Sequence, residues 1–400
     1  MLMSAQPART DVFLKAAAAY AEGEYQQALL AFSSLYEEDP EDDAVCYYLG
    51  LCEFAMNDAE GSEQHLVEAV QRDSTNEWYL HALATVYNAK GNNMKAANLL
   101  EKLVKMNSGL YGNPYTLTLI GDSKLRVRQD SLALSYYNQA LEVDPEYSPA
   151  ELSRAELYRM QGNFAPFFLS LERILRNENA DPQMKSQYLG AIVERIDSRF
   201  YWAWGEQLNN VVDLLLEVQP DDIEAHMLKV NMCSIKGEWD AVIEQCSQME
   251  ALAIAQGNDG KLVEAIAMAG DIKYQYKDDR KGAYKDYERA LKIDPDYAPV
   301  LNNYAYYLSV EERKLKKALE MSRKTVEQEP DNATYLDTYG WLLYQLRRPK
   351  EAKPHFKHAM LYGGKDSDVI LEHYSKVLEA LGENDLSIYY RSLAEQKRAK

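Results

Sequence analysis

The stretch that decides the fold runs from residue 121 to residue 145 and reads GDSKLRVRQDSLALSYYNQALEVDP. It holds a small residue at Gly121, a second one twelve positions later at Ala133, an aromatic residue at Tyr137 and a proline at Pro145. Apolar residues on both sides of the middle recur at three- and four-residue spacing, which is the periodicity of an α-helix. The sequence therefore predicts two helices joined by a tight turn.

The same register recurs along most of the chain. Each of three further prolines follows an alanine by twelve residues, in the pairs Ala28 and Pro40, Ala283 and Pro295, and Ala318 and Pro330. Another small residue stands twelve or thirteen positions before those alanines, at Ala16, Gly270 and Ala305. The interval also separates Ala84 from Ala96 and Gly340 from Ala352. Chance does not repeat such a register, and the pattern predicts a repeat of about 34 residues.

Each residue type in the register has a physical role. Small residues that face each other across two helices let the helix axes approach closely, and an aromatic residue one turn later fills the space beside them. Glycines mark the turn within several pairs, at Gly23, Gly91, Gly162, Gly237 and Gly382. The residue before a proline avoids helical torsion angles, so the Asp-Pro and Glu-Pro steps end the second helix and begin the next repeat.

This pattern resembles the tetratricopeptide repeat, and the longest matching segments are 23–40, 131–145, 283–295 and 304–330. The resemblance implies an all-α fold, a right-handed superhelical solenoid of about eleven antiparallel helix hairpins that accounts for nearly the whole chain. In such a solenoid the first helices line a concave groove. Residues 301–308 (LNNYAYYL) and 335–341 (YLDTYGW) look like those of tetratricopeptide proteins of the Bacteroidetes cell envelope.

Departures from the register suggest how the chain is organised. We expect an N-terminal segment over 1–10, an N-terminal array over 11–180, a divergent helical hairpin over 181–220 and a C-terminal array over 221–400. In the first segment, Ser4-Ala5-Gln6 looks like the small-residue end of a bacterial secretory signal, and a frayed initiator segment is the alternative. The connection from Asn107 to Pro114 is longer than the others.

Composition excludes several classes of function. Lys and Arg total 44 against 63 Asp and Glu, which gives a formal net charge of −19, so nucleic acid is not an expected partner. No apolar run reaches the length that a bilayer span needs, so we expect no direct membrane insertion. Four cysteines are too few for a disulfide scaffold.

Projecting the expected first helices onto the groove gives the candidate binding residues. They are aromatic or hydrogen-bonding side chains, a composition that suits a protein or peptide ligand, because rigid aromatics bury a large area at little entropic cost. The candidates are Tyr47, Phe54, Trp78, His81, Asn88, Asp122, Arg126, Arg159, Tyr306, Asp337, Trp341 and Tyr344. For any single tyrosine, the alternative is that it fills a gap within or between hairpins. Trp78 and Trp341 are the strongest candidates.

Co-chaperones of this repeat family bind a C-terminal carboxylate through Lys, Asn and Arg on successive first helices. Here only Arg126 and Arg159, beside Asn88, offer a comparable group. We expect instead that these arginines are solvated and paired with Asp122 or Glu156.

Three other features call for an interpretation. The aromatic run Arg199-Phe-Tyr-Trp-Ala-Trp-Gly205 predicts a buried seam containing Trp202 and Trp204, with a binding patch or a hinge as alternatives. Cys233 and Cys246 face each other across one expected hairpin, as core thiols or as a disulfide. His355 and His358 lack the further ligands of a zinc site, so we expect an exposed pair and no metal.

No catalytic signature is present, and we expect neither enzymatic activity nor a cofactor. The sequence predicts a non-enzymatic scaffold or adaptor that binds a protein segment in its groove, in the periplasm or another part of a bacterial cell envelope, with the cytoplasm as the alternative location. A second hypothesis is a structural subunit that is held in a larger complex through its convex face and terminal repeats. The oligomeric state stays open.

Overall fold

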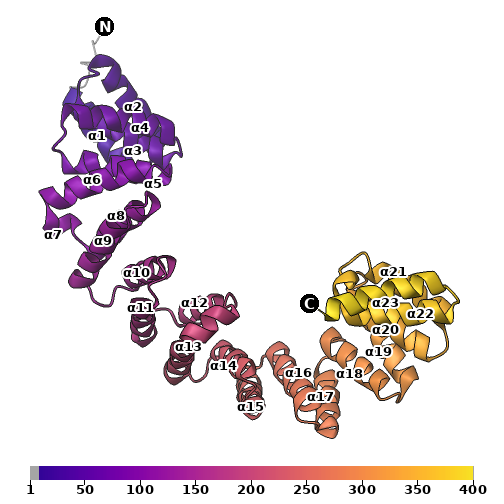
Figure 1. Ribbon diagram of the computed structural model, residues 1–400. Coiled ribbons are helices and arrows are strands. Elements are labelled where there is room, and N and C mark those ends of the chain that lie inside the picture. Colours follow the sequence, from indigo (N-terminus) through magenta and orange to yellow (C-terminus); the bar gives the residue numbers. More distant parts are fainter. Residues whose placement is uncertain (1–8, 400) are drawn as a thin grey trace. The chain divides into compact units, whose positions relative to one another are not determined.

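The computed structural model describes residues 9–399. Within this range the chain forms 23 α-helices, one short 3-10 helix and no strand (Figure 1). The prediction of an all-α fold built from successive helix pairs is confirmed. The possible signal remnant at Ser4-Ala5-Gln6 lies outside the described residues. None of the described helices combines the length and the apolar character that crossing a membrane requires.

The chain separates into two compact units. The first contains the residues up to Lys185 together with Arg199–Val211, and the second contains Ser186–Ser198 together with the residues from Val212 onward. Two helices, α12 (Pro182–Val193) and α13 (Ser198–Val218), contribute residues to both units.

The first unit holds five helix pairs and one additional short helix. The pairs are α1 (Arg9–Ala21) with α2 (Tyr25–Glu38), α3 (Asp43–Ala55) with α4 (Ala59–Arg72), α5 (Glu77–Ala89) with α6 (Asn93–Met106), α8 (Pro114–Arg126) with α9 (Asp130–Val143), and α10 (Ser148–Met160) with α11 (Phe164–Arg176). The short helix α7 (Ser108–Tyr111) occupies the lengthened connection that follows Asn107.

The second unit also holds five pairs. They are α14 (Ile223–Lys236) with α15 (Trp239–Gln256), α16 (Asp259–Tyr276) with α17 (Arg280–Ile293), α18 (Ala298–Val310) with α19 (Leu315–Gln328), α20 (Ala333–Gln345) with α21 (Pro349–Ala359), and α22 (Asp368–Ala380) with α23 (Asn384–Arg398). The 3-10 helix η1 (Gly364–Asp366) precedes α22. Counting α12 and α13 as a pair in chain order, the described residues form eleven successive pairs.

The packing of neighbouring pairs follows one rule in both units. A second helix packs against the first helix of its own pair and against the first helix of the next pair, as α2 does with α1 and α3, and α19 with α18 and α20. First helices also contact the first helix of the following pair, in the series α1, α3, α5 and in the series α16, α18, α20, α22. Within each of these series, the first helices therefore form a continuous surface.

Close contact between a small residue and an aromatic ring holds the two helices of a pair together. A Cβ atom added to Gly340 would lie 2.7 Å from Cε2 of Phe356, and one added to Gly121 would lie 2.5 Å from Cε1 of Tyr137. Both rings are fully buried. Since real Cβ atoms do not approach other atoms so closely, any larger residue at these glycines would push the helices apart.

The helix ends agree with the predicted turn chemistry. Asp39 and Asp144 lie in extended conformation immediately after α2 and α9 and immediately before Pro40 and Pro145, as the restriction on residues before proline requires. The turn glycine Gly23 has a φ of 85°, a conformation that costs glycine little. Other pairs place Asn57, Arg128 or Arg347 in this left-handed region, so the glycine pattern alone missed their turns.

Two of the buried tyrosines are hydrogen-bonded to an aspartate of their own pair. Tyr137 donates its hydroxyl to Asp122 Oδ1 at 2.7 Å, and Tyr287 donates in the same way to Asp271. Each aspartate directly follows the small glycine of its first helix, so the glycine admits the ring and the aspartate binds its hydroxyl. Burial raises the pKa of Asp271 and of both tyrosines.

A glycine-to-alanine pair of variants tests this packing. Alanine favours helix over glycine by about 1 kcal/mol, so G260A, where the new Cβ would meet only Asn258 Oδ1 at 3.6 Å, should be neutral or slightly stabilising. G340A should instead destabilise the protein by about 1–3 kcal/mol, because the methyl group collides with Phe356. Urea denaturation followed by circular dichroism measures both. Equal effects of the two substitutions would contradict the proposed contact.

Candidate protein-binding site

The surface formed by consecutive first helices is the candidate site, because it carries side chains that the hairpin cores do not use. The twelve residues predicted to face it are distributed over α3, α5, α8 and α10 in the first unit and over α18 and α20 in the second. Their environments differ, and the two units are described separately.

In the first unit, two exposed aromatic side chains lie at the starts of first helices. Trp78 is 68% exposed at the start of α5, and Tyr115 is 63% exposed at the start of α8. The exposed His81 follows Trp78 one turn later, with its ring 5.9 Å from that of Tyr111. The sequence analysis missed Tyr115. Its position in the repeat matches that of Trp78, because Tyr115 precedes the small residue Gly121 by the same number of residues as Trp78 precedes the small residue Ala84.

Tyr47 and Phe54 are half-buried packing residues as much as surface residues. The Tyr47 ring lies 4.9 Å from that of Tyr79 and 5.3 Å from that of Tyr48, and burial raises the pKa of Tyr47 to about 12. Phe54 packs against the cluster that contains Leu66. Each offers only part of its side chain to a ligand.

The polar candidates of the first unit are largely engaged within it. Asn88 is half-buried, and Asp122 accepts the hydroxyl of Tyr137, so it belongs to the packing of its pair. Arg159 Nη2 lies 2.7 Å from Glu156 Oε2, which is one of the pairings expected as the alternative to a carboxylate-binding clamp. Arg126 is exposed at the end of α8.

In the second unit, four consecutive first helices enclose a cavity of about 310 Å³. Its lining comes from α16, α18, α20 and the start of α22, and consists of Gln275, Asn302, Asn303, Tyr306, Tyr307, Thr334, Asp337, Thr338, Ser367, Val369 and Ile370. Two of the predicted residues, Tyr306 and Asp337, meet there. The cavity combines aromatic residues with hydrogen-bonding groups.

Trp341 and Tyr344 extend this surface beside the cavity. The Trp341 ring stacks on His373 at 3.9 Å and on Tyr344 at 5.0 Å, and Lys376 Nζ lies 5.4 Å from the centre of the Trp341 ring. His373 in turn lies 2.9 Å from Asp337 Oδ1 through its Nδ1. The sequence analysis missed His373. Its position about one repeat after Asp337 could have indicated that the two residues lie side by side on successive first helices.

Comparison with known proteins agrees with this architecture. Residues 19–69, which run from the end of α1 through most of α4, match the family model described as tetratricopeptide repeat. The chain thus contains a tetratricopeptide-repeat segment in its first unit. Its sequence is 23% identical over 212 residues to a DnaJ protein P58IPK homolog of Arabidopsis thaliana, and 22% identical over 296 residues to a DnaJ protein P58IPK homolog B of Oryza sativa subsp. japonica. These alignments cover 52% and 66% of this chain, but only 42% and 59% of the two relatives.

Two solved structures are similar to parts of this chain at low sequence identity. A tetratricopeptide repeat protein from Parabacteroides merdae matches 73% of this chain and 95% of its own, at 14% identity and a TM-score of 0.36. The MamA protein matches 45% of this chain and 94% of its own, at 16% identity and a TM-score of 0.38.

The structure corrects the interpretation of the aromatic run in α13. Trp202 is 89% exposed, so the prediction that both tryptophans are buried is wrong for Trp202. Phe200 and Trp204 lie four residues apart on one helix face and pack against Phe164, at 4.9 Å and 5.6 Å between ring centres. Trp202, two residues from each, points to another face.

The cysteine and histidine pairs are structural. Cys233 and Cys246 are buried free thiols of one apolar cluster, and burial raises the pKa of Cys246 to about 12. His355 is half-buried edge-on against Tyr339, so the expected exposed pair is wrong for this residue, while His358 Nε2 lies 2.7 Å from Asp331. Across residues 9–399, no cluster of His, Cys, Asp or Glu is arranged to hold a metal ion.

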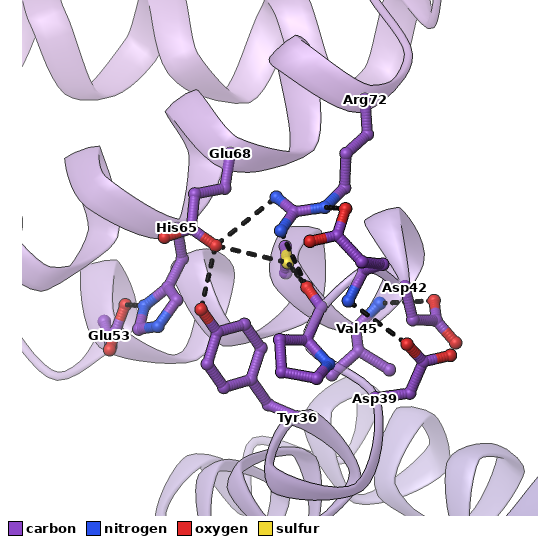
Figure 2. Close-up of polar contacts among 11 residues, drawn as sticks. Tyr36, Asp39, Asp42, Val45, Glu53, His65, Glu68 and Arg72 are labelled. Carbon is purple, nitrogen blue, oxygen red and sulfur yellow. Dashed lines mark hydrogen bonds and ion pairs between the residues drawn. The ribbon is translucent and has the colours of Figure 1, made fainter.

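A polar cluster between α2, α3 and α4 is shown in Figure 2. Glu68 Oε2 accepts the hydroxyl of Tyr36 at 2.9 Å and lies 3.3 Å from Arg72 Nη1. Arg72 also donates to the carbonyl oxygen of Pro40 at 2.7 Å, and the buried Cys46 thiol lies beside Glu68. Because these groups bind one another, the cluster fixes the turn between the first two repeats and offers no open binding position.

His65 in the same region provides a pH test of the local geometry. The hydrogen bond to Glu53, at 2.8 Å, raises the pKa of His65 above its ordinary value of about 6.5, although burial acts in the opposite direction. We expect an NMR titration to show a raised midpoint that falls in E53Q. E60Q, which removes a charge paired with Lys90, should leave the midpoint unchanged.

The sign of the linked stability follows from the raised pKa. The protonated form is favoured by folding, so the contribution of His65 is fully present below its ordinary pKa and disappears as the pH rises through the raised value. The stability lost in H65Q should therefore be larger at about pH 5 than at about pH 9. A loss that grows with pH would contradict the ion pair.

Proposed function

We propose that this protein is a non-enzymatic scaffold or adaptor that binds a protein or peptide segment along its first helices. The observation that carries the proposal is the cavity of the second unit, where Tyr306 and Asp337 line a recess enclosed by four first helices. Beside it, the stacked Trp341 and Tyr344 supply a rigid aromatic wall. Such surfaces bind peptides well, because their side chains lose little freedom on binding.

The first unit supports the same proposal through a different composition. Trp78, Tyr115 and His81 are exposed on neighbouring first helices, α5 and α8, in positions that the hairpin cores do not require. A large aromatic side chain that is exposed to solvent in the unbound protein is a characteristic anchor residue of protein interfaces.

A second candidate function is a structural subunit that is held through its outer helices. This alternative is favoured by large apolar side chains exposed on second helices, with Leu30 on α2 at 69%, Leu169 on α11 at 55% and Ile388 on α23 at 64%. They lie on three different helices, although α23 also exposes Leu386 and Tyr389, and an extensive interface requires a contiguous patch. The first-helix surface therefore remains the leading proposal.

Photo-cross-linking in the native cell distinguishes the two functions. A photoreactive amino acid at His81 or Tyr344 should form adducts with a partner protein, whereas one at Leu30 or Ile388 should not. In the same full-length protein, Trp78→Ala or Trp341→Ala should weaken binding of the identified partner by about tenfold or more, the loss typical of an interface anchor. Trp202→Ala is the matched control, since Trp202 is 89% exposed outside the first-helix surface.

The contrary pattern would overturn the leading proposal. Adducts confined to Leu30 and Ile388, together with unchanged affinity in both groove variants, would establish the structural-subunit function. Thermal unfolding of Trp341→Ala must be measured in parallel, because Trp341 also packs against Tyr344 and His373.

We also propose that the protein acts in an assembly of a bacterial cell envelope. Support comes from residues 301–308 and 335–341, whose sequences resemble those of envelope tetratricopeptide proteins. Fractionation of the native cell, with detection of the untagged protein by antibody, should recover it with the periplasmic or envelope fraction. Recovery with a cytoplasmic marker enzyme would contradict this location and leave the binding proposal intact.

A further inference from the structure

A series of side-chain hydrogen bonds fixes the orientation of two asparagine amides that line the cavity in the second unit. Asp271 on α16 accepts hydrogen bonds from Asn303 Nδ2, at 3.1 Å to each of its oxygens. Asn303 Oδ1 in turn accepts from Asn302 Nδ2 at 3.3 Å. A carboxylate only accepts, so it orients the first amide, and that amide orients the second. Because the Asn302 Nδ2 atom donates to Asn303, the side-chain atom of Asn302 that remains to be paired is its oxygen, Oδ1.

That oxygen has no partner in the described part of the chain. Asn302 is only 4% exposed, and its Oδ1 atom is buried without a hydrogen bond although the residue lines the cavity. A buried acceptor left unpaired costs about 1–3 kcal/mol, so a group that donates to it is favoured there.

The second acceptor of the cavity is Asp337. The residue is 5% exposed, and within residues 9–399 its carboxylate receives one donor, His373 Nδ1, at 2.9 Å and 3.2 Å from its two oxygens. A carboxylate accepts up to about four hydrogen bonds, so capacity remains on the cavity side. Burial, together with the negative charge of Asp337, raises the pKa of the neighbouring Tyr306.

Aromatic rings complete the lining. Tyr306 and Tyr307 line the cavity from α18. The ring of Tyr307 is stacked on that of Tyr274, at 3.6 Å between ring centres, so one of its faces is occupied. The hydroxyl of Tyr307 is already the acceptor for Gln275 Nε2 at 2.7 Å. The cavity thus offers an amide oxygen and a carboxylate beside tyrosine side chains, and these two acceptors favour a positively charged donor.

We propose that this cavity is a subsite for a lysine or arginine side chain of the bound segment, held by Asn302 Oδ1 and the Asp337 carboxylate. The inference rests on the proposed function, since it assigns a chemistry to one position of the peptide-binding surface. A single backbone N–H would satisfy Asn302 but would leave the carboxylate without a new donor. An ammonium or guanidinium group supplies several donors and a charge.

A peptide library of defined composition tests the proposal on the full-length protein. The probes are nonapeptides with degenerate flanks and a central lysine, arginine, norleucine or citrulline, where the last two reproduce the length of the first two without their charge. We expect the immobilised protein to retain the lysine and arginine peptides at least tenfold better than their neutral counterparts. Peptides resynthesised from the retained pool then give dissociation constants by fluorescence anisotropy.

Two variants locate the effect. D337N keeps the shape of the side chain and should weaken binding of the charged peptides about tenfold, as the loss of a hydrogen bond to a charged group does, while leaving the neutral ones unchanged. E379Q removes one charge from α22, at a residue that does not line the cavity and is paired with Arg391, and should change neither. N302L serves as a second cavity variant, and the thermal midpoint of each variant confirms that it folds.

Each contrary outcome is separately informative. Retention of peptides without preference for a basic residue overturns the subsite and leaves the proposed function standing. An equal loss in D337N and E379Q would mean a general attraction to the acidic chain and would also overturn the subsite. Failure to retain any peptide contradicts both the proposed function and this inference.

Discussion

The fold depends on one recurrent contact, in which an aromatic ring of the second helix rests directly on a residue without a large side chain in the first. At Gly340 and Phe356, and at Gly121 and Tyr137, the contact leaves no space for even a methyl group. The distance between the two helices is thereby set, and with it the position of the next first helix. The surface shared by α16, α18, α20 and α22 exists because this spacing is repeated from pair to pair.

The repeat was predictable from sequence because it rests on residue type. A small residue, an alanine twelve or thirteen positions later, an aromatic and a proline are each required by a steric condition, so they recur where the condition recurs. Turns were less visible, since Arg128 and Arg347 adopt a left-handed conformation usually given to glycine. The orientation of Trp202 was also hidden, because aromatic content does not reveal which helix face turns toward a neighbour.

The candidate site was only partly predictable. Projection of single helices found Tyr306, Asp337 and Trp341. It also placed Asp122 on the binding surface, but the carboxylate of Asp122 accepts a hydrogen bond from the hydroxyl of Tyr137 inside the helix pair. The cavity itself is assembled from residues between Gln275 and Ile370, on four helices, and no local pattern contains it. His373 was not predicted for the same reason, because its hydrogen-bond partner Asp337 lies 36 positions earlier in the sequence.

The hydrogen-bonded series from Asp271 through Asn303 to Asn302 crosses from one repeat into the next. Repeats of this kind are commonly treated as modules that can be exchanged or reordered. Here the helix pair α18–α19 carries the two asparagines, but the preceding pair decides which way their amides turn. If this pair were grafted behind a repeat that lacks the aspartate, its amides would be free to reverse, and the same residues would then present a donor. Recognition is thus encoded at the junction between repeats, and a repeat transplanted alone would not bring its specificity with it.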